Sequence, residues 1–328
     1  MRMAITTSIL DRKFKIFLFF AKNIWYLISK CILLHQNHSN MANTNNSHIT
    51  FTKMHGIGND YIYIDCTERM IDNPSELSIA MSPRHTSVGS DGIILICRSE
   101  VADFKMRIFN ADGSEAMMCG NGSRCVGKYV YDHKLTDKTE VTLETLSGVK
   151  HLYLHVNNAT GKVDEVTVNM GAPSFECEKV GVDYVAAEMI EAPIATSAGE
   201  RHITGVSMGN PHGVVFMDSL DGFDISSIGP ELEKHRMWHD RANIEFAEII
   251  DEHTIRMRVW ERGSGETFAC GTGACATAVA AIRTRRALSP VTVKLLGGDL
   301  TISVDSATGD VMMKGGATEV FCGTYCPC

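Results

Sequence analysis

The sequence lacks any cluster of basic residues. Its 31 lysines and arginines are mixed with 39 acidic residues, and the formal net charge is −8. Binding of nucleic acid requires lysine and arginine gathered on one face, so we expect no nucleic-acid partner. The apolar share of 44% and the charged share of 21% are those of an ordinary globular protein. A chain of 328 residues is long enough for two domains with cores of their own.

Long apolar runs are also missing from the N-terminal region. Residues 14–34 are rich in Phe, Ile, Leu and Trp, but Lys22 and Lys30 interrupt them, and the longest apolar run there is residues 16–21. A lysine in mid-span costs roughly 2.5–3.5 kcal/mol on insertion scales. No small-residue cleavage site follows the apolar stretch. We therefore expect neither a membrane anchor nor a signal peptide, and interpret residues 1–48 as an extension outside the fold.

The eleven cysteines include no C-x-x-C pair typical of zinc ribbons or thioredoxin-like sites. Cys322, Cys326 and Cys328 lie in the C-terminal "CGTYCPC", and we interpret residues 324–328 as an exposed, reduced tail without metal. An odd number of scattered thiols fits a reducing cytoplasm.

The chain matches itself when it is shifted by 151 residues. "KMRIFN" at residues 105–110 aligns with "RMRVWE" at 256–261, and "CGNG" at 119–122 aligns with "CGTG" at 270–273. After these motifs the shift becomes 150, and "VTLETLSG" at 141–148 aligns with "VTVKLLGG" at 291–298. A register kept over such a span indicates an internal duplication.

Each copy predicts a strand, a polar turn, a cysteine and then a helix, at residues 123–135 and 273–288. The predicted fold class is therefore α/β (α+β), with two pseudo-symmetric domains that each wrap a curved mixed β-sheet around a central helix. We place the halves at residues 49–163 and 164–315, and we expect residues 316–323 to return to the first half. The active site is expected in the cleft between them, because pockets favour such interfaces.

Cys119 and Cys270 are expected at the N-termini of the two helices. Helix N-terminal N–H groups hold anions and lower a cysteine pKa from about 8.5 toward neutrality. A pseudo-twofold axis would place the two thiols on opposite sides of a bound carboxylate. One sulfur could then take a proton from the adjacent carbon while the other returns one. This arrangement predicts a two-base racemase or epimerase.

Simpler interpretations exist for the individual residues. A lone C-G-x-G is a weak signal, and most cysteines are buried small apolar residues. Asn59 and Asn210 follow glycine, as turn residues do. His212 could be a surface-loop histidine and Arg262 a solvated charge. A thiol-based redox or metal-binding protein is the alternative outside the epimerases, and it would contain zinc or depend on a disulfide.

Five stretches resemble diaminopimelate epimerase and occur in the order of that family: "KMHGIGNDY", "FNADGSEAMMCGNGSRC", "MGNPH", "RANIEF" and "ERGSGETFACGTGAC". The resemblance covers roughly residues 49–321. It implies a cofactor-free isomerase that interconverts LL- and meso-2,6-diaminopimelate for lysine and peptidoglycan synthesis. It also implies a homodimer, with Phe321 at the position of an aromatic dimer contact.

The resemblance implies a role for each matching residue. Cys119 and Cys270 would be the acid/base pair, and His212 and Glu261 would tune the pKa values of their thiols. The implied substrate-binding residues are Asn59, Asn110, Gly120, Asn121, Asn210, Asn243, Glu261, Arg262, Gly271 and Thr272. Two positions depart from the family pattern: Gly92 stands where some members have glutamine, and Thr272 replaces serine. A different epimerase or isomerase of this fold would keep both thiols and change the distal pocket.

Overall fold

The structure is a computed structural model that describes residues 48–327. Except for His48, the predicted N-terminal extension lies outside the described residues, as does Cys328 of the predicted tail. Residues Thr50–Thr324 form one compact unit.

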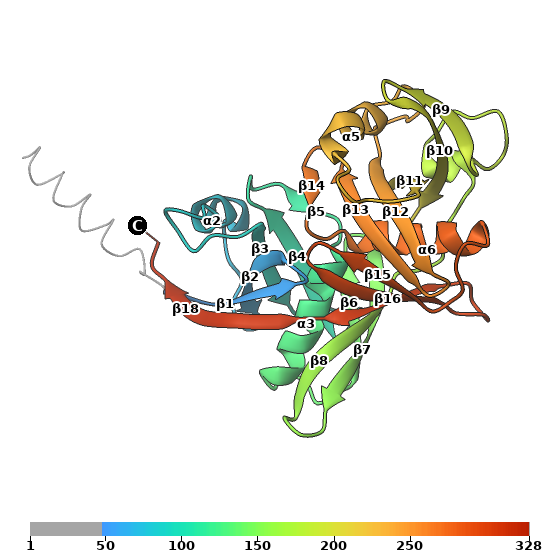
Figure 1. Ribbon diagram of the computed structural model, residues 1–328. Helices are drawn as coiled ribbons and strands as arrows, with labels where there is room; N and C mark the ends of the chain where they lie inside the picture. The colour runs from blue at the N-terminus through green and yellow to red at the C-terminus, as the bar shows by residue number, and fades with distance from the viewer. Residues whose placement is uncertain (1–47, 328) are drawn as a thin grey trace, which may run out of the picture. The chain divides into compact units, whose positions relative to one another are not determined.

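The first half of this unit runs from β1 to β8 and contains two helices (Figure 1). Its elements are β1 (Ile49–Gly56), β2 (Asn59–Cys66), α2 (Pro74–Met81), β3 (Gly92–Cys97), β4 (Phe104–Asn110), β5 (Glu115–Ala116), α3 (Gly120–Asp132), β6 (Glu140–Thr145), β7 (Gly148–Asn157) and β8 (Lys162–Asn169).

The second half repeats this order. Its elements are β10 (Gly199–Ser207), β11 (Pro211–Met217), α5 (Ile225–Glu233), β12 (Asn243–Asp251), β13 (Thr254–Glu261), β14 (Gly265–Thr267), α6 (Gly271–Arg283), β15 (Val291–Leu295), β16 (Gly298–Val304) and β17 (Val311–Gly316). Three elements lie outside the repeat: α4 (Cys177–Val180), β9 (Ala192–Thr196) and β18 (Thr318–Tyr325).

Strand pairing also repeats. The pairs β2–β3 and β11–β12 are parallel, as are β4–β6 and β13–β15. The hairpins β6–β7 and β15–β16 are antiparallel, as are β7–β8 and β16–β17. The predicted mixed sheets and the internal duplication are confirmed at the level of individual strand pairs.

The helices α3 and α6 lie inside their halves. Ten of the thirteen residues of each helix are buried, and most of these have small or apolar side chains, as a helix enclosed on nearly all sides requires. α3 packs against β7 and β8, and α6 packs against β15 and β16 (Figure 1).

Both helices end earlier than the sequence predicts. α3 stops at Asp132 and α6 at Arg283, followed by left-handed residues at equivalent positions, Lys134 with φ 63° and Arg285 with φ 59°. No glycine or proline marks either end, so the composition of these segments predicts helices that continue too far.

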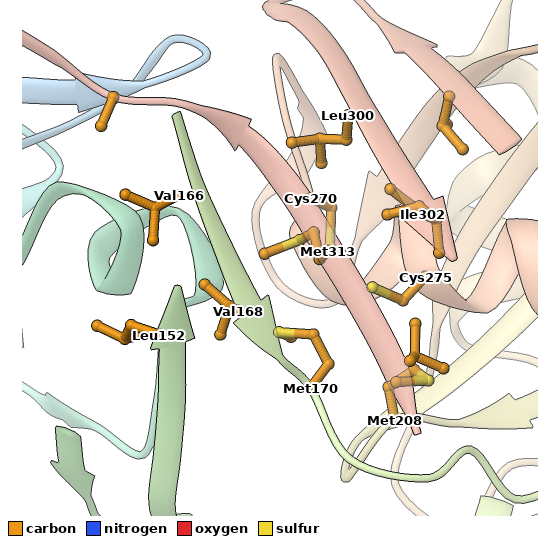
Figure 2. Packing of buried hydrophobic residues seen from close by; sticks show 14 of the residues in the cluster. Leu152, Val166, Val168, Met170, Met208, Cys270, Cys275, Leu300, Ile302 and Met313 are labelled. Carbon is orange, nitrogen blue, oxygen red and sulfur yellow. The ribbon is translucent and has the colours of Figure 1, made fainter. Parts of the chain in front are cut away.

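The halves join through strands and through a shared core. β8 pairs antiparallel with β17, and β18 pairs with β1. One hydrophobic cluster contains Val168 of β8, Met313 of β17 and Cys275 of α6 (Figure 2). The core therefore continues from one half into the other beneath the starts of both helices.

Candidate active site

Cys119 and Cys270 occupy the N-cap positions of α3 and α6. Both have extended backbone angles, with φ −138° and ψ 115° at Cys119 and φ −126° and ψ 109° at Cys270. The Cys119 sulfur accepts from the Gly122 N–H at 3.3 Å, and the Cys270 sulfur accepts from the Gly273 N–H at 3.4 Å. Each thiol thus satisfies one of the N–H groups that a helix leaves free at its start.

The starts of the two helices approach each other. A Cβ atom at Gly120 would lie 2.7 Å from Cε of Met313, and one at Gly271 would lie 3.1 Å from Sδ of the same methionine. The Gly271 Cβ position is also 3.5 Å from Oδ1 of Asn121. Figure 2 shows Met313 beside Cys270 in this part of the core. The two "CG" motifs therefore meet, as the duplication predicts.

The loop that connects β1 and β2 also crosses to the second half. A Cβ at Gly58 would lie 3.3 Å from Cβ of Phe268, two residues before Cys270. Gly58 and its counterpart Gly209 have φ of +88° and +92°, a conformation that glycine adopts without strain. These turns direct Asn59 and Asn210 from equivalent loops toward the cysteines.

Asn59 connects Cys119 to a network of charges. Its Oδ1 accepts from the Cys119 thiol at 3.3 Å, and its Nδ2 donates to Asp91 at 2.9 Å. Arg84 donates to Asp91 and to Asp60 at 2.7 Å each, and Asp60 also pairs with Lys53. Because both ends of the Asn59 amide are held, its orientation beside the thiol is fixed.

Asn210 is held by a different network near Cys270. Its Oδ1 lies 3.0 Å from Nε2 of His212, and Nδ1 of His212 lies 2.7 Å from Oε1 of Glu245. His212 and Glu245 are both completely buried. Because an amide oxygen only accepts hydrogen bonds, Nε2 of His212 is the donor to Asn210.

Thr272 joins this network to the second thiol. Asn210 Nδ2 donates to the Thr272 hydroxyl at 3.4 Å, and that hydroxyl lies 3.6 Å from the Cys270 sulfur. His212 is therefore linked to Cys270 through Asn210 and Thr272, and both of its ring nitrogens are occupied, by Glu245 and Asn210.

The two thiols differ in their charged neighbours. Burial raises the pKa of Cys119, the Gly122 N–H and the Arg124 guanidinium act in the opposite direction, and the Glu261 carboxylate adds to the rise. Burial, and then the carboxylates of Glu261 and Glu245, raise the pKa of Cys270 well above its ordinary value. The pKa of each thiol is therefore raised and not shifted toward neutrality as the sequence predicted, because burial outweighs the helix N-termini.

Glu261 ends β13 close to Cys270. Its carboxylate accepts a hydrogen bond from the Thr267 hydroxyl, and burial raises the pKa of this carboxyl. The equivalent residue in the first half is Asn110, whose Nδ2 donates to the Ser114 hydroxyl at 3.0 Å. One half thus presents a carboxylate where the other presents an amide.

Asn243 and Arg262 are bound to each other and to nearby loops. Asn243 Oδ1 accepts from the Arg262 backbone N–H at 2.9 Å, and its Nδ2 donates to the Pro211 carbonyl at 3.3 Å. The Arg262 guanidinium donates to the Asp240 carbonyl at 2.9 Å and to its carboxylate at 3.1 Å. The structure therefore places the Arg262 side chain in an ion pair with Asp240.

Gly92 occupies a position that only glycine fits here. Its φ is +153°, and a Cβ atom would lie 2.1 Å from the Phe109 carbonyl oxygen. The local backbone therefore excludes any side chain at this position, including the glutamine that the resemblance suggests for other members.

Sequence analysis missed Asp91, Glu245 and Arg124. Glu245 lies between apolar residues of the buried strand start "NIEFA", and Arg124 lies inside the buried helix α3. A charged residue at a buried position is rare unless it is paired. This signal could have indicated both residues once their elements were recognised as core.

The described residues contain neither a cluster of metal-ligating side chains nor a helix suited to span a membrane. Within residues 48–327, no three His, Cys, Asp or Glu side chains form a group that could hold a metal ion. None of the helices in this part of the chain is long and apolar enough to cross a membrane.

Comparison with known proteins confirms the resemblance found in the motifs. The family model described as "Diaminopimelate epimerase" matches residues 51–176 and 204–320, one segment in each half. A diaminopimelate epimerase of Agathobacter rectalis is 52% identical over 283 residues, which are 83% of this chain and 98% of that protein. A diaminopimelate epimerase of Bacteroides thetaiotaomicron is 54% identical over 275 residues, 84% of this chain and 97% of that protein.

Solved structures share the fold at low identity. A PhzF-family phenazine biosynthesis protein of Bacillus anthracis aligns with a TM-score of 0.63 at 18% identity, covering 85% of this chain and 99% of that one. A hydroxyproline epimerase of Agrobacterium vitis with bound trans-4-hydroxy-L-proline aligns with a TM-score of 0.61 at 16% identity, covering 84% and 92%.

Proposed function

The chain belongs to the diaminopimelate epimerase family, and we propose that it interconverts LL- and meso-2,6-diaminopimelate without a cofactor. The observation that carries this proposal is the placement of Cys119 and Cys270 at equivalent helix N-caps, with the first turns of the two helices meeting at Met313.

The helix starts are the proposed site for the substrate α-carboxylate. The first-turn residues Gly120, Asn121, Gly271 and Thr272 present backbone N–H groups, and two helix N-termini together favour an anion. Negative charge that develops on this carboxylate as the α-carbon loses its proton would meet dipoles that are already in position.

Proton transfer requires one thiolate and one thiol at a time. Arg124 lies near Cys119, Glu245 lies near Cys270, and Glu261 lies near both thiols. We therefore assign the resting thiolate to Cys119 and the protonated thiol to Cys270. After one turnover their protonation states are exchanged, so the pair titrates as a coupled unit.

Asn110, Asn243 and Arg262 are proposed to recognise the distal amino-acid centre. Arg262 has a planar donor fork suited to a carboxylate, and a distal carboxylate would replace Asp240 as its partner. Since Asn243 holds the Arg262 backbone, it would orient this arginine in addition to any contact of its own.

The proposed setting is lysine and peptidoglycan precursor synthesis in the cytoplasm, where the free thiols of residues 48–327 stay reduced. We also propose a homodimer through β18, where Val320 and Phe321 are exposed and Phe321 packs edge-on against Phe51 at 6.0 Å. Light scattering of the protein as it elutes from a size-exclusion column gives its molar mass. The mass of a monomer would exclude the dimer.

Incubation with LL-diaminopimelate in deuterated water tests the activity. We expect meso-diaminopimelate with deuterium at the inverted α-carbon, identified by chiral chromatography with mass detection. Proline and 4-hydroxyproline serve as parallel substrates, because a structural neighbour carries a hydroxyproline. Deuterium exchange into proline but not into diaminopimelate would instead assign an epimerase or racemase activity on proline.

A further inference from the structure

Arg124 is a completely buried arginine that has no acidic partner within residues 48–327. It is one of the largest fully buried side chains in this part of the chain, and its exposed fraction is 0%. Its Nε donates to the Gly316 carbonyl at 3.2 Å, and its Nη1 lies 3.8 Å from the Met313 sulfur. Its Nη2 has no hydrogen-bond partner. A buried charge is normally paired, so this guanidinium needs another explanation.

The backbone is shaped around this side chain. A Cβ atom at Gly56 would lie 3.0 Å from Nη2 of Arg124, and one at Gly315 would lie 3.2 Å from its Nε. Glycine on both sides, in β1 and in β17, leaves the space that the guanidinium fills. The cation therefore has a built position beneath the starts of α3 and α6.

The ionisable groups that face Arg124 are neutral until they lose a proton. They are Cys119 and Cys125 of α3, Tyr63 of β2 and Cys275 of α6. Burial raises the pKa of Cys125 to about 11 and that of Cys275 to about 12, and raises the pKa of Tyr63 well above its ordinary value. Cys119 differs from these three because it also accepts the Gly122 N–H at the helix start.

We propose that Arg124 supplies the fixed positive charge that stabilises the thiolate of Cys119, and so selects Cys119 as the resting base. This inference rests on the proposed function, because it assigns a thiolate to the two-base reaction. Arg124 acts through Cys119 and is a positioning residue. The other ionisable groups that face Cys119 are Tyr61 and Tyr63 of β2, Cys125 of α3 and Glu261 of β13.

The duplication supports this role. The residue equivalent to Arg124 in the second half is Cys275, so the cation occurs in one copy only. Cys270 lacks an equivalent arginine on its own helix and instead faces Glu261 and Glu245. Glu261 faces both thiols, so the guanidinium near Cys119 and the additional carboxylate of Glu245 near Cys270 would separate the two thiols into base and acid.

The test compares the variants R124M and R124K with K128M, a matched loss of one positive charge on the same helix. Lys128 pairs with Asp132 at 2.8 Å. The measurement is the rate at which iodoacetamide alkylates Cys119 across a pH series, followed by peptide mass spectrometry without substrate. Because the thiolate is the reactive form, a pKa raised by one unit slows the reaction about tenfold below that pKa.

We expect R124M to slow Cys119 alkylation about tenfold at pH 8 and to approach the wild-type rate at high pH. R124K should keep most of the wild-type profile, and K128M should match it. In the epimerase assay R124M should lower kcat with little change in KM. The alkylation measurement uses no substrate. It therefore tests the role of Arg124 independently of the proposed epimerase activity.

A wild-type alkylation profile in R124M would overturn the proposal. Failure of both R124M and R124K to fold would overturn it as well, because a packing role would then explain the arginine. Equal slowing by K128M would show a general effect of net charge and would also contradict it.

Discussion

The surroundings of Cys119 and Cys270 differ far more than their backbones do. Both cysteines cap thirteen-residue helices and accept the N–H three residues later. Around Cys119, Asn59 is held by Asp91 and Arg84, which are partly exposed. Around Cys270, Asn210 is held by His212 and Glu245, which are completely buried. Duplication preserved the frame while the side chains diverged.

The divergence has a chemical consequence. A reaction that inverts one carbon needs two equivalent positions, but at any moment it needs one base and one acid. The exchange of Asn110 for Glu261 and of Arg124 for Cys275 between the halves makes the electrostatics unequal. We infer that the symmetric frame sets the geometry and that the asymmetric charges decide which thiol starts as the base.

The largest expected effect comes from removing either thiol. Cys119→Ala and Cys270→Ala should each lower the epimerisation rate by about 10³-fold or more, since a missing general acid or base costs roughly 10²–10⁴-fold. Each variant keeps one thiol and should still exchange the α-proton of one stereoisomer only. Deuterium incorporation into LL- and meso-diaminopimelate measures this, and full turnover by either variant would contradict the two-base mechanism.

The second prediction compares the stability contributed by the network that holds Asn59 with that contributed by the network that holds Asn210. Glu245→Ala leaves the buried His212 without its partner and should lower the free energy of unfolding by about 3–5 kcal/mol. Asp91→Ala breaks a partly exposed pair and should cost about 0–1 kcal/mol. Urea denaturation of both variants measures the difference. Equal losses would show that burial does not distinguish the networks.

The repeated parts of the fold could be predicted from the sequence, because each motif occurs twice and the two copies support the same interpretation. The "CGNG" and "CGTG" turns located both helix N-caps, and the aligned strands β4 and β13 followed from their alternating patterns. The helix ends were missed because Lys134 and Arg285 adopt left-handed conformations without glycine. Local composition does not predict a helix end that lacks glycine and proline.

Within the candidate site, the sequence indicated residue types but not their partners. The ion pair of Arg262 with Asp240 and the tie of Asn243 to Arg262 depend on how loops fold onto β12. The network from Asn210 to Glu245 crosses from the β10–β11 loop to the adjacent strand β12. Contacts of this kind arise from tertiary packing, which a residue pattern does not encode directly.

The third prediction concerns the order in which the thiols ionise. Burial raises the pKa of both cysteines, and the nearby carboxylates raise that of Cys270 further. As pH increases, iodoacetamide should therefore alkylate Cys119 first, with a separation of at least about tenfold in rate at a pH below both pKa values. Peptide mass spectrometry of the substrate-free enzyme measures both rates. Faster reaction of Cys270 would reverse the assignment of base and acid.

The smallest effect should come from Glu261, the carboxylate in the second half whose counterpart in the first half is the amide of Asn110. Glu261→Gln removes a negative charge near Cys270 and should lower the pKa of that thiol, so that its thiolate forms at lower pH. We expect alkylation of Cys270 to accelerate roughly three- to tenfold at fixed pH, on the order of half to one pKa unit. Glu266→Gln is the matched control, because Glu266 lies on the adjoining strand β14 and pairs with Arg258 at 2.7 Å. If E261Q and E266Q changed the rate equally, the effect would reflect overall charge, and the proposed contribution of Glu261 to the inequality of the two thiols would be wrong.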